Sequence, residues 1–444
     1  MASSSAKKWM VIGLGGTGLS VVRWLAANGE VATLVDDRAD FDAADVLAVM
    51  PAATVANGAT SDVSLDGIDC VVASPGISPR HELIKRAMDA GVEVISDIEL
   101  FCRSAAQPIV AVTGSNGKST VVSLLKDMCD AARVSALAGA NLGVPALELL
   151  TDEPDVTYLL ELSSFQLERT RSLNAIAAVV LNVSEDHIDW HGNIEHYRDA
   201  KLRIYDDCEF AVINADDLSL QPQQGQPVRV EFTLREPTSR QFGVATIDGE
   251  RCLMFGSEKL VQISNCALRG THNVANMLAA LALGSAIDLP LSAMRESLKR
   301  FNGLRHRHQH IGDYDGVHWI NDSKATNIGA SLASVAAVSG PVILLLGGRA
   351  KGESFEALAK ALPAHVRQCI IYGENRDTLA LVLEQAGHHF QSVLSLDDAV
   401  TVAAKQATRG DTVLLAPAAA SQDAFDNYAA RGDRFVELVR ERCA

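Results

Sequence analysis

An apolar run that leads into a glycine-rich turn and then into a helix-like stretch recurs along this chain of 444 residues. The first such unit begins at Trp9 and the second at Pro108, and apolar runs again alternate with helix-like stretches from about Gly303 onward. Strands that alternate with helices form parallel sheets, because the chain must cross the sheet between two parallel strands. Ligands bind at the carboxyl ends of such strands. The pattern predicts α/β domains with sites at strand–helix turns, and the length suits about three of them.

The apolar runs also place individual elements. Helices are expected over 17–27 and, buried, over 277–283, and the more polar stretch from about Asn214 to Leu268 should hold short strands. The other strands are expected at 9–12, 31–35, 108–114, 157–163, 177–183, 318–322, 342–348, 369–373 and 412–417.

The composition excludes several classes of protein. Lys and Arg number 39 and Asp and Glu 55, so the net charge is −16, and a surface this acidic disfavours nonspecific binding to nucleic acid or anionic membranes. The eight cysteines are scattered without a C-x-x-C pair, which argues against a zinc ribbon or a disulfide framework. No signal-peptide pattern opens the chain, and no stretch approaches the ~20 apolar residues of a membrane span. We expect a cytoplasmic protein without membrane insertion or a nucleic-acid partner.

The most informative string is AVTGSNGKST at 111–120, where a strand ends and a helix begins. Its glycines permit a tight loop whose backbone N–H groups face phosphate, Lys118 supplies a charge for the β- and γ-phosphates, and the Ser119 hydroxyl can bind Mg²⁺. The string departs from the full P-loop pattern, because Val112 stands where the first glycine would be. The alternative is a strand-to-helix turn that merely contains glycines. The candidate phosphate-binding residues are Gly114, Ser115, Asn116, Gly117, Lys118, Ser119 and Thr120.

A second glycine string, GLGGTG at 13–18, matches G-x-G-x-x-G after a strand, and Asp36 and Asp37 end the next strand. The start of a helix favours a diphosphate, and a carboxylate can meet a ribose or a base. A nucleotide-sugar diphosphate would use the same contacts as NAD. The string therefore predicts a nucleotide diphosphate site, with close helix–strand packing without a ligand as the alternative.

Polar groups gather in the middle of the chain, at Glu161, His187 and Lys201. Glu161 and Ser119 offer the hard oxygen ligands that Mg²⁺ prefers. An isolated histidine is more often structural, and the neighbouring Asp186, Asp189, His191 and His196 equally suit a solvated loop. Metal binding and a structural role both remain open for this cluster.

Further along, Arg305 and Arg307 stand among histidines and form a positive patch in an acidic chain, which suits a phosphate clamp or a solvated loop. The strings NDSKATN at 321–327 and APAAASQDAFDNY at 416–428 each follow an expected strand. Both place small polar groups at strand ends, where plain turn chemistry is the alternative.

Together these strings resemble the Mur ligases, the ATP-dependent enzymes that add amino acids to peptidoglycan precursors. The resemblance covers essentially the whole chain, and NDSKATN together with ELSSFQL favours the members that add D-glutamate over their siblings and over folylpolyglutamate synthetase. The matching strings, in order, are GLGGTG, ASPGIS, TGSNGKST, GANLG, ELSSFQLE, NVSEDHIDWH, AKLRIY, THNVANMLAAL, GLRHR, NDSKATN and APAAASQD.

The resemblance implies an α/β fold of three domains: a Rossmann-like domain over 1–97 for the UDP substrate, a central P-loop-type ATPase domain over 98–302 with a mostly parallel sheet, and a Rossmann-like domain over 303–444 for D-glutamate and part of ATP. It implies a cytoplasmic monomer that joins D-glutamate to UDP-N-acetylmuramoyl-L-alanine. The carboxylate would be phosphorylated by ATP to an acyl phosphate, and the amine of D-glutamate would attack it through a tetrahedral intermediate, with release of ADP and phosphate.

The resemblance also implies roles for residues. It makes Lys118, Glu161, His187 and Lys201 catalytic, with Ser119 and Glu161 on one Mg²⁺, His187 on a second, and Lys201 carbamylated as a further metal ligand. Asn273, Arg307 and Asp322 resemble ATP contacts. The positions that match substrate contacts are Gly16, Thr17, Asp36, Asp37, Arg38, Ser74, Gly76, Asn141, Lys324, Thr326, Lys351, Ser421 and Tyr428.

Two positions depart from the family pattern. Asp37 stands where a hydroxyl residue is familiar, and Arg349, in the string that leads to Lys351, stands where an acidic residue is common in some relatives.

Three other functions remain as alternatives: an NAD(P)-dependent oxidoreductase, a nonenzymatic UDP-sugar-binding regulator, and a sibling ligase for another amino acid or for folate. A dehydrogenase has no use for the second phosphate loop at 114–120. A binding protein with decayed catalysis would not need its candidate catalytic residues intact, and Lys118, Glu161, His187 and Lys201 are all present.

Overall fold

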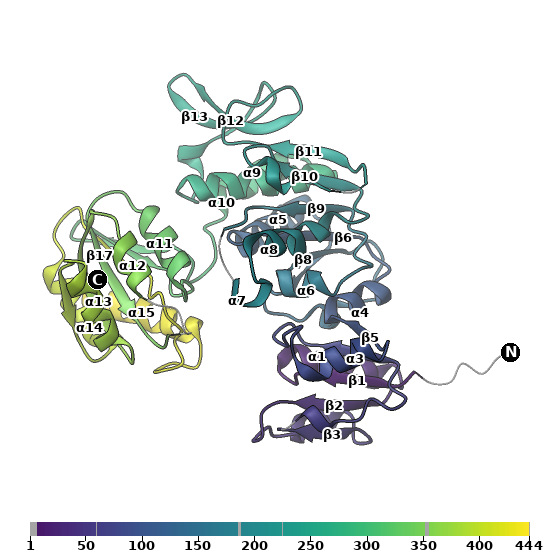
Figure 1. Cartoon of the computed structure of the whole chain (residues 1–444). Coiled ribbons are helices and arrows are strands. Elements are labelled where there is room, and N and C mark those ends of the chain that lie inside the picture. Colours follow the sequence, from purple (N-terminus) through teal and green to yellow (C-terminus); the bar gives the residue numbers. More distant parts are fainter. Residues whose placement is uncertain (1–6, 59, 185–187, 224, 351–354, 444) are drawn as a thin grey trace. The chain divides into compact units, whose positions relative to one another are not determined.

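The computed structural model describes residues 7–443 except 59, 185–187, 224 and 351–354, and it divides into two compact units. Unit 1 comprises Met1–Cys266 and Ala275–Lys299, and unit 2 comprises Ala267–Val274 and Arg300–Ala444. Unit 1 contains two sheets and unit 2 contains a third (Figure 1).

The first sheet has five parallel strands in the order β3-β2-β1-β4-β5. The chain order reverses beside β1, and such a switch point is where open α/β sheets bind ligands. Its strands are β1 (Trp9–Ile12), β2 (Ala32–Asp36), β3 (Thr54–Asn57), β4 (Cys70–Ala73) and β5 (Glu93–Ile95). The helices of this part are α1 (Gly16–Ala27), α2 (Ala44–Val49), α3 (Glu82–Asp89), α4 (Asp97–Ser104) and the 3₁₀ turn η1 (Thr60–Asp62).

The second sheet has nine strands in the order β14-β13-β12-β11-β10-β9-β6-β8-β7. It is parallel from β7 to β12, and β13 and β14 extend it as antiparallel strands. Its strands are β6 (Ile109–Thr113), β7 (Ala136–Ala140), β8 (Thr157–Glu161), β9 (Ala177–Val180), β10 (Phe210–Asn214), β11 (Val228–Phe232), β12 (Gln241–Ile247), β13 (Glu250–Phe255) and β14 (Glu258–Gln262). The helices that follow along the chain are α5 (Lys118–Ala132), α6 (Ser164–Glu168), α7 (Ile188–His191), α8 (Ile194–Leu202), α9 (Thr271–Ala286) and α10 (Leu291–Arg300), with 3₁₀ turns η2 (Ala146–Leu149), η3 (Arg203–Tyr205), η4 (Leu218–Leu220) and η5 (Ile263–Asn265).

The third sheet, in unit 2, has six strands in the order β15-β16-β20-β17-β18-β19, all parallel except the hairpin of β15 and β16. Its strands are β15 (Gln309–Tyr314), β16 (Val317–Asn321), β17 (Val342–Gly347), β18 (Val366–Tyr372), β19 (Phe390–Ser392) and β20 (Thr412–Leu415). Its helices are α11 (Ile328–Ala336), α12 (Glu356–Ala361), α13 (Arg376–Gln385), α14 (Leu396–Gln406) and α15 (Tyr428–Cys443).

Strand β17 shows why the predicted apolar runs are continuous rather than alternating. Its side chains contribute in turn to two separate cores, with Leu344 in one and Leu345 in the other. A parallel strand covered by helices on both faces must be apolar at every position. The three mostly parallel sheets confirm the predicted α/β class, and strands β11 to β14 confirm the short strands expected in the polar middle segment.

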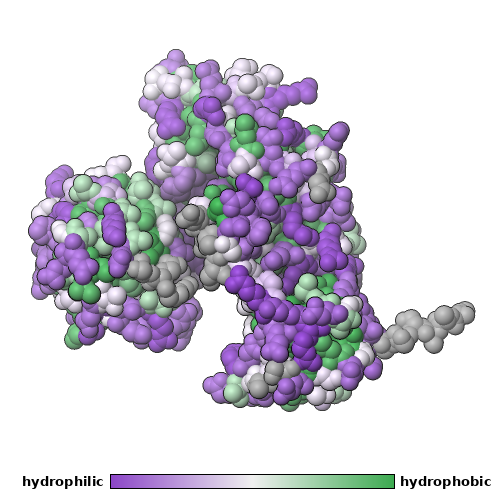
Figure 2. All heavy atoms as spheres, in the orientation of Figure 1, coloured by the Kyte–Doolittle hydropathy of each residue, from purple (hydrophilic) through white to green (hydrophobic). Residues whose placement is uncertain are grey.

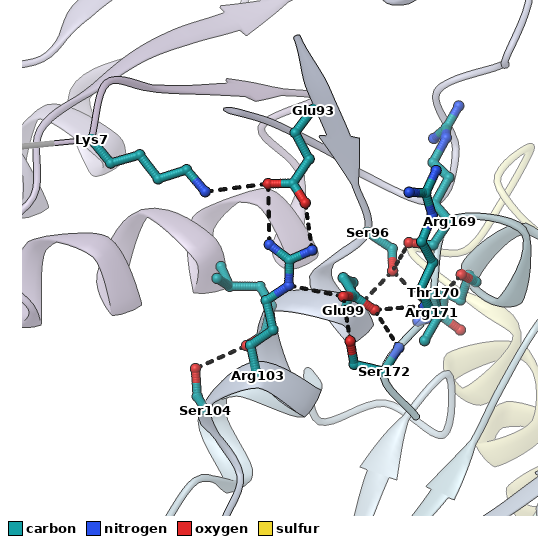
Figure 3. Close-up of polar contacts among 12 residues, drawn as sticks. Lys7, Glu93, Ser96, Glu99, Arg103, Ser104, Arg169, Thr170, Arg171 and Ser172 are labelled. Atoms are coloured by element: carbon teal, nitrogen blue, oxygen red, sulfur yellow. Dashed lines mark hydrogen bonds and ion pairs between the residues drawn. The ribbon is translucent and has the colours of Figure 1, made fainter. Parts of the chain in front are cut away.

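A polar network fastens the first sheet to the loop between α6 and β9 within unit 1 (Figure 3). The buried carboxylate of Glu99 accepts hydrogen bonds from the backbone N–H of Arg171 (2.6 Å) and of Ser172 (2.9 Å). Arg103, one turn further along α4, donates from Nε to Glu99 (2.8 Å) and also pairs with Glu93 on β5. The end of β5 and helix α4 are thereby tied to the loop that leads into β9 of the second sheet.

The surface is mostly hydrophilic on the face drawn in Figure 2, with hydrophobic residues in scattered groups. Among the described residues, no helix combines the length and apolar character that crossing a bilayer requires.

Candidate active site

A cleft of about 670 Å³ opens in unit 1 at the switch point of the first sheet. Its walls come from the β1–α1 turn, from the ends of β2 and β4, and from the segment after β7 in the central sheet. Eight of the predicted substrate-binding residues line it together: Gly16, Thr17, Asp36, Asp37, Arg38, Ser74, Gly76 and Asn141. The structure thus brings residues from both sheets of unit 1 to one cavity.

The glycine turn of this cleft is built by close packing. Gly13 has a φ of +85°, and a Cβ on Gly18 would lie 2.0 Å from the carbonyl oxygen of Gly13. The hydroxyl of Ser74 donates to that same oxygen at 2.6 Å. Only glycine allows helix α1 to begin so close to the end of β1, so its N-terminal N–H groups face the cleft.

Asp36 is the internal anchor of the turn. Its Oδ2 accepts a hydrogen bond from the N–H of Leu14 at 2.8 Å, and Arg38 donates to both of its oxygens, from Nε at 2.7 Å and from an Nη at 2.9 Å. The hydrogen bond from Arg38 outweighs burial and lowers the pKa of Asp36 to about 2. Asp36 is therefore ionised at neutral pH, and it shapes the turn and holds Arg38 in place.

Asp37 contacts residues from two other segments of the first sheet's domain, Thr60 and His81. Its carboxylate lies 3.0 Å from Nε2 of His81 and accepts a hydrogen bond from the hydroxyl of Thr60 at 2.9 Å. About half of the Asp37 side chain is exposed. These local partners occupy part of the hydrogen-bonding capacity of the Asp37 carboxylate, at the position where the resemblance implies a hydroxyl.

Asp97 and Gln166 also line the cleft, and the sequence analysis did not predict either polar residue as an individual site. Asp97 is 2% exposed, its Oδ2 accepts a long hydrogen bond of 3.4 Å from Gln166, and its Oδ1 has no partner among the described residues. Burial raises the pKa of Asp97 to about 6. In the sequence this residue follows Ser96 as an ordinary first-turn acid of a helix, so no signal marked it.

The phosphate loop predicted at 114–120 comprises the turn after β6 and the first residues of α5, at the expected junction of strand and helix. Gly117 has a φ of +87°, and a Cβ there would lie 2.3 Å from the side-chain oxygen of Asn276. Asn182 braces the loop, because its Oδ1 accepts from the N–H of Asn116 (2.9 Å) and its Nδ2 donates to the carbonyl of Asn116 (3.0 Å). Neither Asn182 nor Asn276 could be assigned to the loop from sequence, since both come from distant segments.

Two lysines converge on the loop at one carbonyl oxygen. Lys118 donates from Nζ to the carbonyl of Gly114 at 2.7 Å and to that of Ser115 at 3.0 Å. Lys201, only 1% exposed on α8, donates to the same Gly114 carbonyl at 2.9 Å and lies over the ring of Tyr197. The two predicted catalytic lysines are therefore adjacent, although 83 positions separate them in the numbering.

Ser119 and Glu161 are joined directly. The Ser119 hydroxyl donates to Oε2 of Glu161, and Nδ2 of Asn141 donates to Oε1 of the same carboxylate at 2.6 Å. Glu161 is 3% exposed, and no ion pair of Glu161 is found in the described part of the chain. Because Asn141 also lines the cleft, this hydrogen-bonded set connects the predicted phosphate loop with the cleft.

Of the histidines singled out in the middle of the chain, the structure describes His191 but not His187. His187 lies outside the described residues. His191 is buried, its Nε2 lies 3.0 Å from the hydroxyl of Ser164, and its ring stacks on Phe165. The alternative of a solvated loop is therefore wrong for His191.

The predicted ATP contacts of unit 2 lie on three segments: Asn273 in α9, Arg307 just before β15, and Asp322 just after β16. Asn273, in the first turn of α9, donates from Nδ2 to the carbonyl of Arg269, which precedes the helix. Burial raises the pKa of Asp322 to about 6, while its hydrogen bonds with Ser334 and His308 and the charge of Arg307 act in the opposite direction. Asp322 and Arg307 are thus electrostatically coupled.

The arginine patch is smaller than the sequence indicated. Arg305 forms an ion pair with Asp433, so its charge is already balanced. Burial lowers the pKa of His308 to about 4, so this histidine is neutral at pH 7. Arg307 remains the candidate phosphate contact of this segment.

Of the residues predicted to position D-glutamate, Lys324 and Tyr428 are in contact in unit 2. The Nζ of Lys324 lies over the ring of Tyr428 at 4.2 Å. Ser421 is buried in the loop that follows β20, and Thr326 is half-buried. Lys351 lies outside the described residues, and Arg349 pairs with Glu374.

A buried arginine that the sequence did not single out organises this region. Arg431 is 1% exposed and donates to the hydroxyl and the carbonyl of Ser323, at 3.0 and 2.9 Å, and to the carbonyl of Ala419. Its guanidinium joins the NDSKATN loop to the loop after β20. An arginine inside a terminal helix carries no signal of such a role.

Three family models match the chain in order. They are a Mur ligase MurD-like N-terminal domain over residues 7–96, a Mur ligase middle domain over 112–284, and a Mur ligase glutamate ligase domain over 306–419. The UDP-N-acetylmuramoylalanine--D-glutamate ligase of Escherichia coli strain K12 is 42% identical over 446 residues, which cover 99% of this chain and 100% of that protein. The protein of the same name from Nitrosococcus oceani is 42% identical over 97% of this chain and 96% of that protein.

Solved structures share the fold at lower identity. The UDP-N-acetylmuramate-alanine ligase of Thermotoga maritima superposes with a TM-score of 0.58 at 18% identity, and a murein peptide ligase from Psychrobacter arcticus with 0.54 at 17%. Each comparison covers 98% of this chain and 99% of the other. With three domain models matched in order and 42% identity along its length, the chain belongs to the Mur ligase family.

Proposed function

We propose that this Mur ligase joins D-glutamate to UDP-N-acetylmuramoyl-L-alanine with hydrolysis of ATP. Relatives with 41–42% identity over the full chain are named for that activity. The observation that carries the proposal is the set Ser119–Glu161–Asn141, which links the phosphate loop to the cleft. A UDP-linked substrate held at the glycine turn would thereby present its free end near the phosphates of ATP.

The reaction needs an activated acid, because a free carboxylate is a poor electrophile. Transfer of the γ-phosphoryl group of ATP to the alanine carboxylate forms an acyl phosphate and releases ADP. The amine of D-glutamate then attacks the acyl carbon, and the tetrahedral intermediate collapses to the amide with loss of phosphate and a proton. Such transfers depend on positioning and on charge neutralisation. Lys118 supplies a positive charge, and the N–H groups that begin α5 supply dipoles.

Mur ligases use ATP and Mg²⁺. The residues of unit 1 fit a magnesium ion, since Ser119 and Glu161 offer hard oxygen ligands side by side. Within the described part of the chain, the donors to the buried Glu161 carboxylate are the neutral side chains of Ser119 and Asn141. When bound, the ion would neutralise phosphate charge. We assign a second ion to His187.

Lys201 is the candidate carbamate. Its Nζ lies beside neutral oxygens of the phosphate loop. Reaction of the free amine with CO₂ would form an N–C bond, release a proton and replace a positive group by an anionic oxygen ligand. That change of sign would make Lys201 attract a metal ion instead of repelling it.

We assign the remaining sites as the resemblance does. Asn273, Arg307 and Asp322 would contact ATP, and Lys324, Thr326, Lys351, Ser421 and Tyr428 would position D-glutamate. We also expect a cytoplasmic enzyme that acts as a monomer.

Phosphate release from ATP and Mg²⁺ tests the proposal. We expect release only when UDP-N-acetylmuramoyl-L-alanine and D-glutamate are both present, with L-glutamate as the matched control. Release with a different amino acid would instead identify a sibling ligase. Reduction of NAD(P) by the protein, or absence of ATP binding, would contradict the proposed chemistry.

A further inference from the structure

A cluster of metal-ligating side chains lies on the β15–β16 hairpin of unit 2, and no step of the proposed reaction uses it. The Nε2 of His310 is 2.7 Å from Oδ1 of Asp313, and the Nδ1 of His318 is 2.6 Å from that same oxygen. All three ligand atoms lie within 4.8 Å of one another. Each side chain is about half exposed, so an ion can reach the cluster from solvent.

The convergence depends on an irregularity in the hairpin. Asp313 is directly opposite His318, and His310 is opposite Ile320, with a register shift between His310 and Gly312. Side chains alternate between faces along a strand, so residues 310 and 313 would ordinarily point to opposite faces. The bulge at Ile311 adds one residue and turns His310 to the face of Asp313 and His318.

We propose that His310, Asp313 and His318 form a surface site for a divalent transition-metal ion of the zinc class. Two imidazoles and one carboxylate are a ligand set that suits Zn²⁺, with water completing a tetrahedron. Ligands about 2.1 Å from such an ion are roughly 3.4 Å apart. The present separations from the carboxylate oxygen therefore need to widen by less than ~1 Å, which exposed side chains can accommodate.

The position indicates what the ion does. Strand β15 is at the edge of the six-stranded sheet and is paired with β16. An ion bound across the hairpin ties this edge strand to its neighbour at the bulge, where ladder hydrogen bonds are interrupted. Residues 305–308, which include the candidate ATP contact Arg307, lead directly into β15. The ion therefore stabilises the hairpin and the segment that precedes it.

Competition with a chromophoric zinc chelator tests the site on the full-length protein. We expect the wild type to bind one more Zn²⁺ than the double variant His310→Ala/His318→Ala. The variant His389→Ala, which removes an exposed histidine elsewhere in unit 2, should retain the wild-type number. Zinc bound near Glu161 or at cysteines is common to all three proteins and cancels in the comparison.

A second variant separates ligation from hairpin structure. Asp313→Asn keeps the size of the side chain but removes its charge, and we expect at least about tenfold weaker binding at this site, since loss of even an outer-shell partner costs that much. Zinc should raise the melting temperature of the wild type more than that of the double variant. Equal zinc numbers and equal melting shifts in the wild type and the double variant would overturn the proposal, whatever the ligase assay shows.

Discussion

The hydroxyl of Ser119 donates a hydrogen bond to the carboxylate of Glu161, a residue 42 positions further along the chain. The two meet because β6 and β8 are neighbouring parallel strands, and Glu161 is paired with Val112 just before the phosphate loop. Parallel pairing thus delivers a hydroxyl and a carboxylate to one point, where both can face a metal ion.

Glu161→Gln should lower turnover by at least about 100-fold, because the substitution removes the anionic metal ligand. The amide also cannot accept hydrogen bonds at both of its ends, as the carboxylate does from Ser119 and Asn141. Steady-state kinetics across a magnesium titration measure the effect. Glu148→Gln, which alters a surface carboxylate paired with Arg23, is the matched control and should behave as the wild type. Equal magnesium dependence in both variants would contradict the assignment.

Lys118→Ala should abolish turnover while the chain stays folded, because charge on the transferred phosphoryl group is no longer balanced. Lys126→Ala is the control, since Lys126 lies on the same helix but pairs with Asp130 at the surface. Phosphate release and circular dichroism compare the two variants. Normal turnover in Lys118→Ala would remove the phosphate-loop assignment.

Lys201→Ala should also be inactive, and a short carboxylic acid added to the assay should restore part of the activity. The alanine leaves space where the carbamate would lie, and a small carboxylate can supply the missing anionic oxygens. Lys201→Arg serves as the comparison, because it keeps the positive charge and fills that space. Full activity of Lys201→Ala at low magnesium would show that Lys201 has no metal role.

Asp97→Asn should make unit 1 more stable at neutral pH. The carboxyl of Asp97 has a pKa of about 6 in the fold, above its ordinary value near 3.9, so the folded state holds the proton more tightly. The wild type therefore loses stability as the pH rises from about 4 to 6, by up to about 3 kcal/mol. The variant should lack this loss. Its gain in stability over the wild type should therefore be greatest above pH 6 and should vanish below about pH 4. Urea unfolding at several pH values measures this, and parallel profiles would contradict the interpretation.

The sequence predicted the parts of the fold and site that depend on local pattern. Continuous apolar runs located buried parallel strands such as β17, and the glycine string located the turn between β6 and α5, where Gly117 has a positive φ. It did not predict residues whose role depends on tertiary contact. Asn182 and Arg431 act through backbone atoms far away in the chain, and their local sequences are those of an ordinary loop and an ordinary helix.

Glu99→Gln should destabilise unit 1 by about 1–3 kcal/mol, because the amide leaves one of several buried donors unmatched. Burial raises the pKa of Glu99, but hydrogen bonds from the N–H groups of Arg171 and Ser172 and from side chains outweigh it and lower the pKa overall. The stability that this carboxylate contributes is present above its unfolded pKa, near 4.3, and is lost as the pH falls through the folded value. The variant should therefore show a flatter acid limb in urea unfolding. Glu93→Gln, which alters a side chain that is 37% exposed, should destabilise unit 1 less than Glu99→Gln does. An equal loss of stability in the two variants would contradict the central role of Glu99.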